Sequence, residues 1–316
     1  MRRFALLSVI AAAAIAAPLL AQNAKLPQPP PVDPALATPE TLGLGYEDSL
    51  RMTVPVSIGA SGPYRFIIDT GAERTVVSNE LAGSLNLAAG RRVRVTTMAG
   101  QSVLSTFLLP ALQVSLVKPD TIEAPAVSAA NLGAPGMLGI DALKGHAVAI
   151  DFDRNLMEVR PSKKRRESAG PDDIVIRAKN LYGQLIVTDA TYKGRRISVV
   201  IDTGSPVTIG NLAMLKRVRT EKSLGKIGLL AVTGQWLQAD YRVIDSLEIA
   251  KVGFHSIPIA FADALPFKRF GLTDTPALML GMDTLKLFRR VQIDFANREI
   301  RLTLPKDVQT DRTRFQ

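Results

Sequence analysis

Apolar residues alternate with other residues over short stretches along much of the chain, which is the period of half-buried β-strands. Every second residue from Met52 to Ile58 is apolar. Similar patterns predict further strands at 93–97, 103–108, 148–152, 185–192 and 197–201. Turn-forming pairs such as Lys193-Gly194 separate these segments. The pattern predicts an all-β fold.

The second half of the chain repeats landmarks of the first half in the same order. The triplet Asp-Thr-Gly occurs at residues 69–71 and again at 202–204, each time after an apolar run. The segment MLGIDALK, which begins at Met137, returns as MLGMDTLK from Met279. Matches that keep their order across two halves indicate a duplication.

A third match defines how far each copy extends. AIDFDRN at 149–155 corresponds to QIDFANR at 292–298. We therefore expect two homologous barrel lobes in tandem, at 43–160 and 174–306, joined by a linker at 161–173. Because two copies do not make a solenoid, a face-to-face pair of lobes is the natural assembly.

The N-terminal segment 1–21 has the composition of an export signal. Arg2 and Arg3 precede a long apolar stretch, and Ala21 is the small residue expected at a cleavage site. Leu19 is large where a small residue is preferred, so an uncleaved N-terminal anchor is the alternative. No later stretch is apolar enough to span a bilayer.

The segments outside the lobes are polar or rich in proline. We interpret 22–42 as an extended Pro-rich tether and 307–316 as a tail. The linker 161–173 contains the charged run Lys163–Arg166, which is typical of solvated connections.

Composition excludes several classes of chemistry. The chain has no cysteine, so disulfides and thiol catalysis are excluded. His146 and His255 are the two histidines, and neither a serine triad motif nor a zinc motif accompanies them. The net charge of +10 suits solubility better than nucleic-acid binding, because no basic-aromatic pattern accompanies it. We expect no metal and no cofactor.

The repeated triplet suggests a chemistry of its own. Asp69 and Asp202 lie on equivalent loops of the two copies, so they can face each other around one water molecule. Two such carboxyls share a proton and activate the water for attack on a peptide bond. Gly71 and Gly204 suit these loops, because a tight loop needs close backbone approach.

These motifs, over about residues 45–305, resemble an aspartic protease of the pepsin and retroviral-protease superfamily. The closest likeness is to a bacterial exported member with two retropepsin-like lobes. The resemblance implies a pepsin-like bilobal arrangement with the active site at the lobe interface. It also implies a polypeptide substrate, a monomer with both catalytic residues in one chain, and a periplasmic or secreted location. An anchor in the inner membrane, facing the periplasm, is the alternative location.

The resemblance also assigns roles to individual residues. It implies catalysis by Asp69 and Asp202, with Thr70 and Thr203 cross-linking the two loops. The segments that brace the loops from behind are Leu138-Gly139 and Leu280-Gly281.

One difference between the triplets predicts an asymmetric dyad. Ser205 follows the second triplet, where Ala72 follows the first. A serine hydroxyl bonded to the carboxylate would favour the charged form of Asp202 and leave the proton on Asp69. The alternative is that Ser205 only caps its loop.

Two segments occupy the positions of the flap hairpins that close over substrate in this superfamily. They are 97–102, with Met98 and Gly100, and 232–236, with Gly234 and Trp236. The flap tyrosine of pepsin is missing, and Trp236 could equally be a packing residue.

Four further aspartates recur in pairs, for which we expect structural roles. Asp141 and Asp283 are predicted to cap helices, and Asp151 and Asp294 to make structural hydrogen bonds.

Two functions compete with an active endopeptidase. One is a non-catalytic module that binds extended peptides, and the other is an envelope interaction protein that reuses the fold. The presence of both aspartates argues against each.

Overall fold

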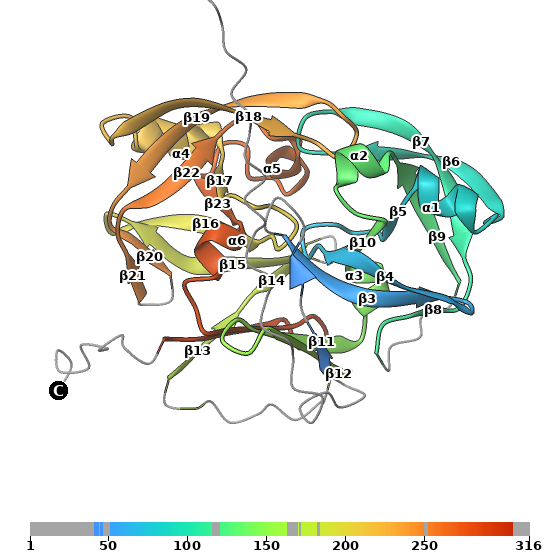
Figure 1. Ribbon diagram of the computed structural model, residues 1–316. Coiled ribbons are helices and arrows are strands. Elements are labelled where there is room, and N and C mark those ends of the chain that lie inside the picture. The colour runs from blue at the N-terminus through green and yellow to red at the C-terminus, as the bar shows by residue number, and fades with distance from the viewer. Residues whose placement is uncertain are drawn as a thin grey trace, which may run out of the picture. The chain divides into compact units, whose positions relative to one another are not determined.

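The computed structural model describes residues 41–43, 45–46, 51–115, 121–162, 170, 172–181, 184–249 and 252–305 (Figure 1). The predicted export signal, nearly all of the tether, the charged run of the linker and the C-terminal tail lie outside these residues. In the part that the structure describes, no helix is both long and apolar enough to cross a membrane.

The first half forms a nine-stranded sheet with three short helices. The strand order is β2 (Gly45–Tyr46), β3 (Met52–Ile58), β4 (Ser61–Ile68), β10 (Gly136–Leu138), β5 (Val76–Ser78), β9 (Ile122–Val127), β7 (Gln101–Leu109) and β6 (Ala89–Thr96), with β8 (Leu112–Gln113) paired to β3. The helices are α1 (Asn79–Ser84), α2 (Ala129–Leu132) and α3 (Ile140–Leu143). The alternating apolar residues of β3 are fully or almost fully buried, as their period predicts.

The second half repeats this arrangement in a ten-stranded sheet. Its order is β18 (Ser223–Leu230), β19 (Trp236–Ile244), β22 (Ile257–Phe261), β17 (Ile209–Gly210), β23 (Ala277–Leu280), β16 (Arg195–Ile201), β15 (Gln184–Tyr192), β20 (Leu247–Ile249) and β21 (Val252–Phe254), with β14 (Lys179–Leu181) paired to β15. The helices are α4 (Leu212–Arg217), α5 (Leu265–Arg269) and α6 (Met282–Leu285). The order β4-β10-β5-β9-β7-β6 corresponds to β16-β23-β17-β22-β19-β18. The prediction of two β lobes in tandem is confirmed.

Equivalent side chains begin equivalent helices in the two halves. The Ser78 hydroxyl accepts from the amide of Leu81 at the start of α1, at 3.0 Å. Asn211 accepts from the amide of Met214 at the start of α4, at 2.8 Å. Such caps satisfy amides that have no partner within the helix. The duplication thus extends to the level of single hydrogen bonds.

A six-stranded sheet joins the two halves beneath the lobes, at the bottom of Figure 1. Its order is β1 (Thr41–Gly43), β12 (Leu156–Pro161), β11 (His146–Asp151), β24 (Arg290–Asp294), β25 (Glu299–Thr303) and β13 (Asp173–Arg177). The duplicated AIDF and QIDF segments pair with each other at its centre, where Ile150 lies opposite Val291 and Ala149 opposite Gln292. The main aliphatic core continues through this sheet, with Ile150 and Ile293 fully or almost fully buried. The two lobes are therefore joined by a common sheet and a continuous core.

The aspartates of these paired strands have structural roles, as predicted. Asp294 accepts hydrogen bonds from the Ser162 hydroxyl at 2.5 Å and the Asn297 amide at 2.9 Å. Asp151 accepts from the amide of Arg154 at 2.9 Å. These bonds fix the turns that leave the shared sheet.

Candidate active site

Each Asp-Thr-Gly loop begins where a buried central strand ends. Strand β4 runs into Asp69 and strand β16 runs into Asp202. The amide of Asp69 donates to the carbonyl of Leu138 at 2.9 Å, and the amide of Asp202 donates to that of Leu280 at 3.0 Å. Strands β10 and β23 thus hold the base of each loop, in the position expected of the bracing segments.

The bracing glycines allow a second stretch of backbone to pass close by. A Cβ atom on Gly139 would lie 2.4 Å from the carbonyl carbon of Arg74. A Cβ atom on Gly281 would lie 2.3 Å from the carbonyl oxygen of Val207. Because any side chain here would collide with backbone, only glycine fits at both positions.

Asp141 and Asp283 do not cap helices, contrary to the prediction. The N-caps of α3 and α6 are the bracing glycines, and each aspartate lies in the first turn. Asp141 instead accepts from the amide and hydroxyl of Thr75, at 2.8 and 2.7 Å. Asp283 makes the same two bonds with Thr208, at 3.0 and 2.7 Å. Both threonines follow their triplets at the same distance in the sequence, which by itself assigns no role to either.

Thr70 and Thr203 cross-link the two loops. The Thr70 amide donates to the Thr203 hydroxyl at 3.0 Å, and the Thr203 amide donates to the Thr70 hydroxyl at 3.2 Å. Each hydroxyl also donates to the strand that precedes the opposite loop, to Ile201 at 3.1 Å and to Ile68 at 2.8 Å. Both side chains are buried. These four hydrogen bonds form a threonine lattice, which fixes the two loops relative to each other.

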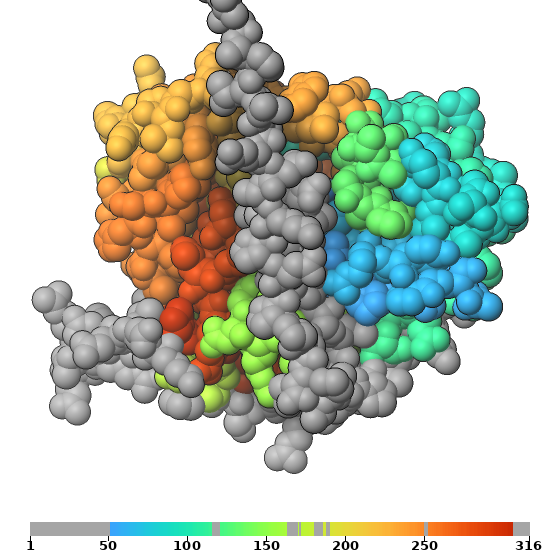
Figure 2. Space-filling model, viewed as in Figure 1, coloured from blue at the N-terminus to red at the C-terminus, as the bar shows by residue number. Residues whose placement is uncertain are grey.

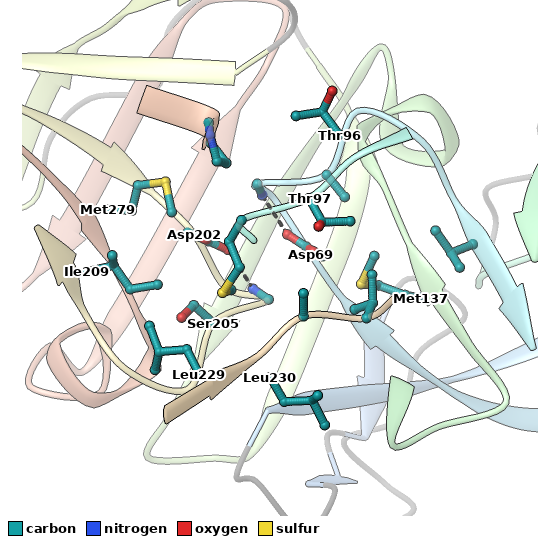
Figure 3. A pocket seen from close by; sticks show the side chains of 18 of the residues that line it. Asp69, Thr96, Thr97, Met137, Asp202, Ser205, Ile209, Leu229, Leu230 and Met279 are labelled. Carbon is teal, nitrogen blue, oxygen red and sulfur yellow. Dashed lines mark hydrogen bonds between the residues drawn. The ribbon is translucent and has the colours of Figure 1, made fainter. Parts of the chain in front are cut away.

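The two carboxyl groups lie beside each other in a cavity that both halves line (Figure 3). A Cβ atom built on Gly71 would lie 2.7 Å from Asp202 Oδ1 and 3.1 Å from Asp69 Oδ1. A Cβ atom on Gly204 would lie 2.1 Å from the carboxyl carbon of Asp69. Each glycine therefore leaves room for the aspartate of the other half. Each aspartate also accepts from the amide of its own glycine, at 2.7 Å for Asp69 and 3.1 Å for Asp202.

The surroundings make the two carboxyls unequal. Burial raises the pKa of both groups, because a charged carboxylate loses its hydration. The pKa of Asp202 rises well above its ordinary value, since the neighbouring charge of Asp69 adds to burial. Backbone bonds and the Arg51 guanidinium hold the pKa of Asp69 down against the effect of burial. These surroundings therefore favour the neutral form of Asp202 more strongly than that of Asp69.

This assignment reverses the expectation based on Ser205. The Ser205 hydroxyl donates to the carbonyl of Val207 at 2.7 Å, so it fixes its own loop. After the amide bond from Gly71, the positive charge of Arg51 is the next largest effect that lowers the pKa of Asp69. Sequence reasoning missed Arg51 because two strands, β3 and β4, separate it from the triplet. Arg51 is held by a 2.6 Å bond from Nη2 to the carbonyl of Leu132, and it lines the cavity.

The dyad opens into a cavity of about 860 Å³. Its apolar lining comes from both halves and includes Val76, Met98, Met137, Ile209, Leu229 and Met279. Figure 3 shows Met137 and Met279 on opposite sides of the two aspartates. Such a volume suits a segment of polypeptide or another ligand of comparable size.

Two hairpins cover the cavity, at the positions predicted for flaps. The turn 97–100 joins β6 to β7, and the turn 231–235 joins β18 to β19. Their tips meet, because a Cβ atom on Gly100 would lie 2.3 Å from the side-chain oxygen of Gln235. Figure 2 shows the yellow-to-orange atoms of the second half reaching the cyan and green atoms of the first half at the top of the view.

Each flap tip packs on the lobe opposite its own. Met98 packs against the apolar cluster of the second half, and its carbonyl accepts from the amide of Leu265 at 3.2 Å. Val232 packs against the cluster of the first half. Gly234 has a positive φ of 83°, which suits the turn. Trp236 lines the cavity yet is 71% exposed, so it is not a core packing residue.

Two family models match the chain, one in each half. Residues 54–145 match the family model described as gag-polyprotein putative aspartyl protease. Residues 188–284 match the family model described as aspartyl protease. No curated protein matches the chain. Each match contains one Asp-Thr-Gly triplet and one bracing glycine.

Proposed function

We propose that this chain, which carries two aspartyl protease domains in tandem, is an endopeptidase whose domains complete one active site. The observation that carries the proposal is the mutual fit of the loops, in which each triplet glycine makes room for the other half's aspartate. The buried threonine lattice holds that arrangement in place. Fixed geometry of this kind is what general acid–base catalysis requires.

In the proposed mechanism the dyad carries one proton. Ionised Asp69 takes a proton from a water molecule, whose oxygen bonds to the scissile carbonyl carbon. Asp202 gives its proton to the carbonyl oxygen, which leaves a tetrahedral diol. The C–N bond then breaks as Asp69 returns its proton to the nitrogen and Asp202 accepts one from a hydroxyl. The dyad is restored, and the products are a carboxylic acid and an amine.

The flap strands support an extended polypeptide as the substrate. Strand β6 is the edge of the first sheet, and strand β18 is the edge of the second. The end of each strand and the start of the turn that follows it line the cavity, at 94–98 and 227–232. An edge strand offers unpaired backbone groups, so an extended chain between the two can bond to both. A folded substrate would have to unfold locally to reach this position.

Cleavage of an unfolded protein tests the proposal. The purified chain is expected to cleave casein, to be inhibited by pepstatin, and to lose activity in Asp69→Asn and in Asp202→Asn. Peptide binding without turnover would instead favour a non-catalytic binding module. Neither binding nor turnover would favour an interaction protein of the cell envelope.

The proposal includes a monomeric enzyme that works outside the cytoplasm. Both aspartates come from one chain, so one chain suffices for a complete site. Specific activity that stays constant on dilution supports this, and activity that falls would indicate a dimer. Fractionation of cells that express the full chain distinguishes a periplasmic or secreted enzyme from one anchored in the inner membrane by residues 1–21.

A further inference from the structure

The two halves line the cavity with unlike side chains at matching positions. After the first triplet, Glu73 and Arg74 line the cavity. At the same distance after the second triplet, the lining residues are Pro206 and Val207. A duplicated site thus has one charged wall and one apolar wall.

The flap strands repeat this difference. Arg94 lies two residues before the end of β6, and Gly228 lies two residues before the end of β18. Both line the cavity. Trp236 occupies the space above Gly228, since a Cβ atom there would lie 3.0 Å from the indole ring. The last residues of the two strands differ in the same sense, with Thr96 opposed to Leu230.

The charged residues of the first wall, Glu73, Arg74 and Arg94, do not neutralise one another. Glu73 is neutralised across the cavity by Arg269, with N–O distances of 2.8 and 2.6 Å. Nη2 of Arg74 donates a hydrogen bond to the backbone carbonyl of Glu123, at 2.8 Å. The carboxylate of Glu123 attracts Arg74 but is itself bonded to Arg91, so a single carboxylate faces two guanidinium groups.

Arg94 has no such partner. Arg94 is exposed, makes no hydrogen bond or ion pair with any residue that the structure describes, and belongs to the segment of the flap that lines the cavity. Together with Arg74, it leaves a net positive charge on this wall. Carboxylates are the natural partners of guanidinium groups, because two parallel N–H bonds match the two oxygens.

We infer that this enzyme selects substrates with an acidic side chain on one side of the scissile bond and a large apolar side chain on the other. Arg74 and Arg94 bind the carboxylate, and Val207, Leu230 and Trp236 contact the apolar side chain at the mirrored position. This rests on the proposed function, because an extended substrate across the dyad places its residues against both walls. Asp or Glu is therefore required at one subsite only.

Sequencing of the peptides released from a proteome-derived peptide library tests this inference. We expect Asp or Glu to be enriched at one subsite and apolar residues at the subsite of the opposite side. Matched fluorogenic peptides with Glu or Gln at the first subsite then give the preference as a ratio of kcat/KM values. A charge-assisted bond predicts a preference for Glu of about tenfold.

Variants of Arg94 locate the preference. Arg94→Gln should bring the Glu-to-Gln ratio close to one, and Arg94→Glu should favour a Lys peptide. Arg154→Gln is the matched control, because Arg154 is exposed and lies outside the cavity lining. It removes the same charge and should leave the ratio unchanged. An equal effect of both variants, or cleavage without any acidic preference, would overturn the inference.

A binding measurement separates this inference from the proposed function. Fluorescence anisotropy with Asp202→Asn reports binding of the same Glu and Gln peptides without turnover. Tighter binding of the Glu peptide, lost in Arg94→Gln, supports the inference even if the wild-type chain cleaves nothing. Dyad-dependent cleavage with equal binding of both peptides would retain the protease and refute the acidic subsite.

Discussion

Thr70 and Thr203 exchange hydrogen bonds across the two halves of the chain, each amide donating to the hydroxyl of the other residue. Each hydroxyl in turn donates to a carbonyl of the opposite lobe. The pair therefore bonds four backbone groups from two strands that are far apart in sequence. The separation of the Asp69 and Asp202 carboxyls depends on these bonds.

Replacement of Thr203 by valine should weaken both stability and catalysis. Valine keeps the shape but leaves two backbone groups without their partner, which costs about 1–3 kcal/mol for each buried group. Urea unfolding should show this loss, and kcat should fall while the flap contacts remain. Thr220→Val, at an exposed position, is the control and should change stability by less than about 0.5 kcal/mol. Equal stability of the two variants would contradict the role of the lattice.

Replacement of either triplet glycine by alanine should displace the aspartate of the other half from its position. The new methyl group of Gly71→Ala would lie 2.7 Å from Asp202 Oδ1, and that of Gly204→Ala 2.1 Å from the Asp69 carboxyl carbon. We expect activity to fall by at least about 100-fold, as for other misplaced reacting groups. Gly83→Ala is the control, because nothing lies within 4 Å of its added carbon. Full activity in Gly204→Ala would refute the close approach of the loops.

Arg51 should set the acid limb of the pH–rate profile. Its positive charge favours the ionised form of Asp69 and lowers the pKa of that carboxyl. Because the proposed mechanism needs Asp69 ionised, Arg51→Gln should move the acid limb of kcat/KM to higher pH. Ser205→Ala should leave the limb in place, because its hydroxyl bonds to Val207. The reverse result would restore Ser205 as the source of the asymmetry.

Asp202 should also make stability depend on pH. Folding raises its pKa well above the ordinary value of 3.8, so the folded chain binds this proton more tightly than the unfolded chain. Its contribution to stability is therefore complete below that value and is lost as pH rises through the folded pKa. Asp202→Asn removes this dependence, so its stability relative to wild type should increase with pH above about 4. Thermal unfolding of both proteins at a series of pH values measures the difference. A constant difference would show that Asp202 is not raised.

The dyad and its supports could be predicted from the sequence because the duplication marks them. Asp69 and Thr70 each have a counterpart that the structure brings to the same place, and the counterpart of Gly139 braces the other loop. The alternation of apolar residues predicts long strands such as β3, β7 and β15, whereas short strands such as β5, β10 and β17 have too few residues to show a period. The two flap segments were expected from the resemblance to the protease superfamily, and the structure has a hairpin turn at each of them.

The remaining features depend on contacts between distant segments. Arg51 approaches the dyad only through the pairing of β3 with β4. The bonds of Asp141 to Thr75 look like helix caps in sequence, because both arrangements place an aspartate near a helix start. The central sheet was also missed, since pairing of β11 with β24 cannot be read from either strand alone. In each case a tertiary contact decides the role.

The most direct test of the central claim is a double-mutant cycle on the two aspartates. It measures kcat/KM for one peptide with wild type, Asp69→Asn, Asp202→Asn and the double variant. If the carboxyls act as one unit, each single variant should lose at least about 1,000-fold, and the double variant should be no worse than either. Independent losses that multiply in the double variant, or substantial activity in either single variant, would contradict a shared dyad.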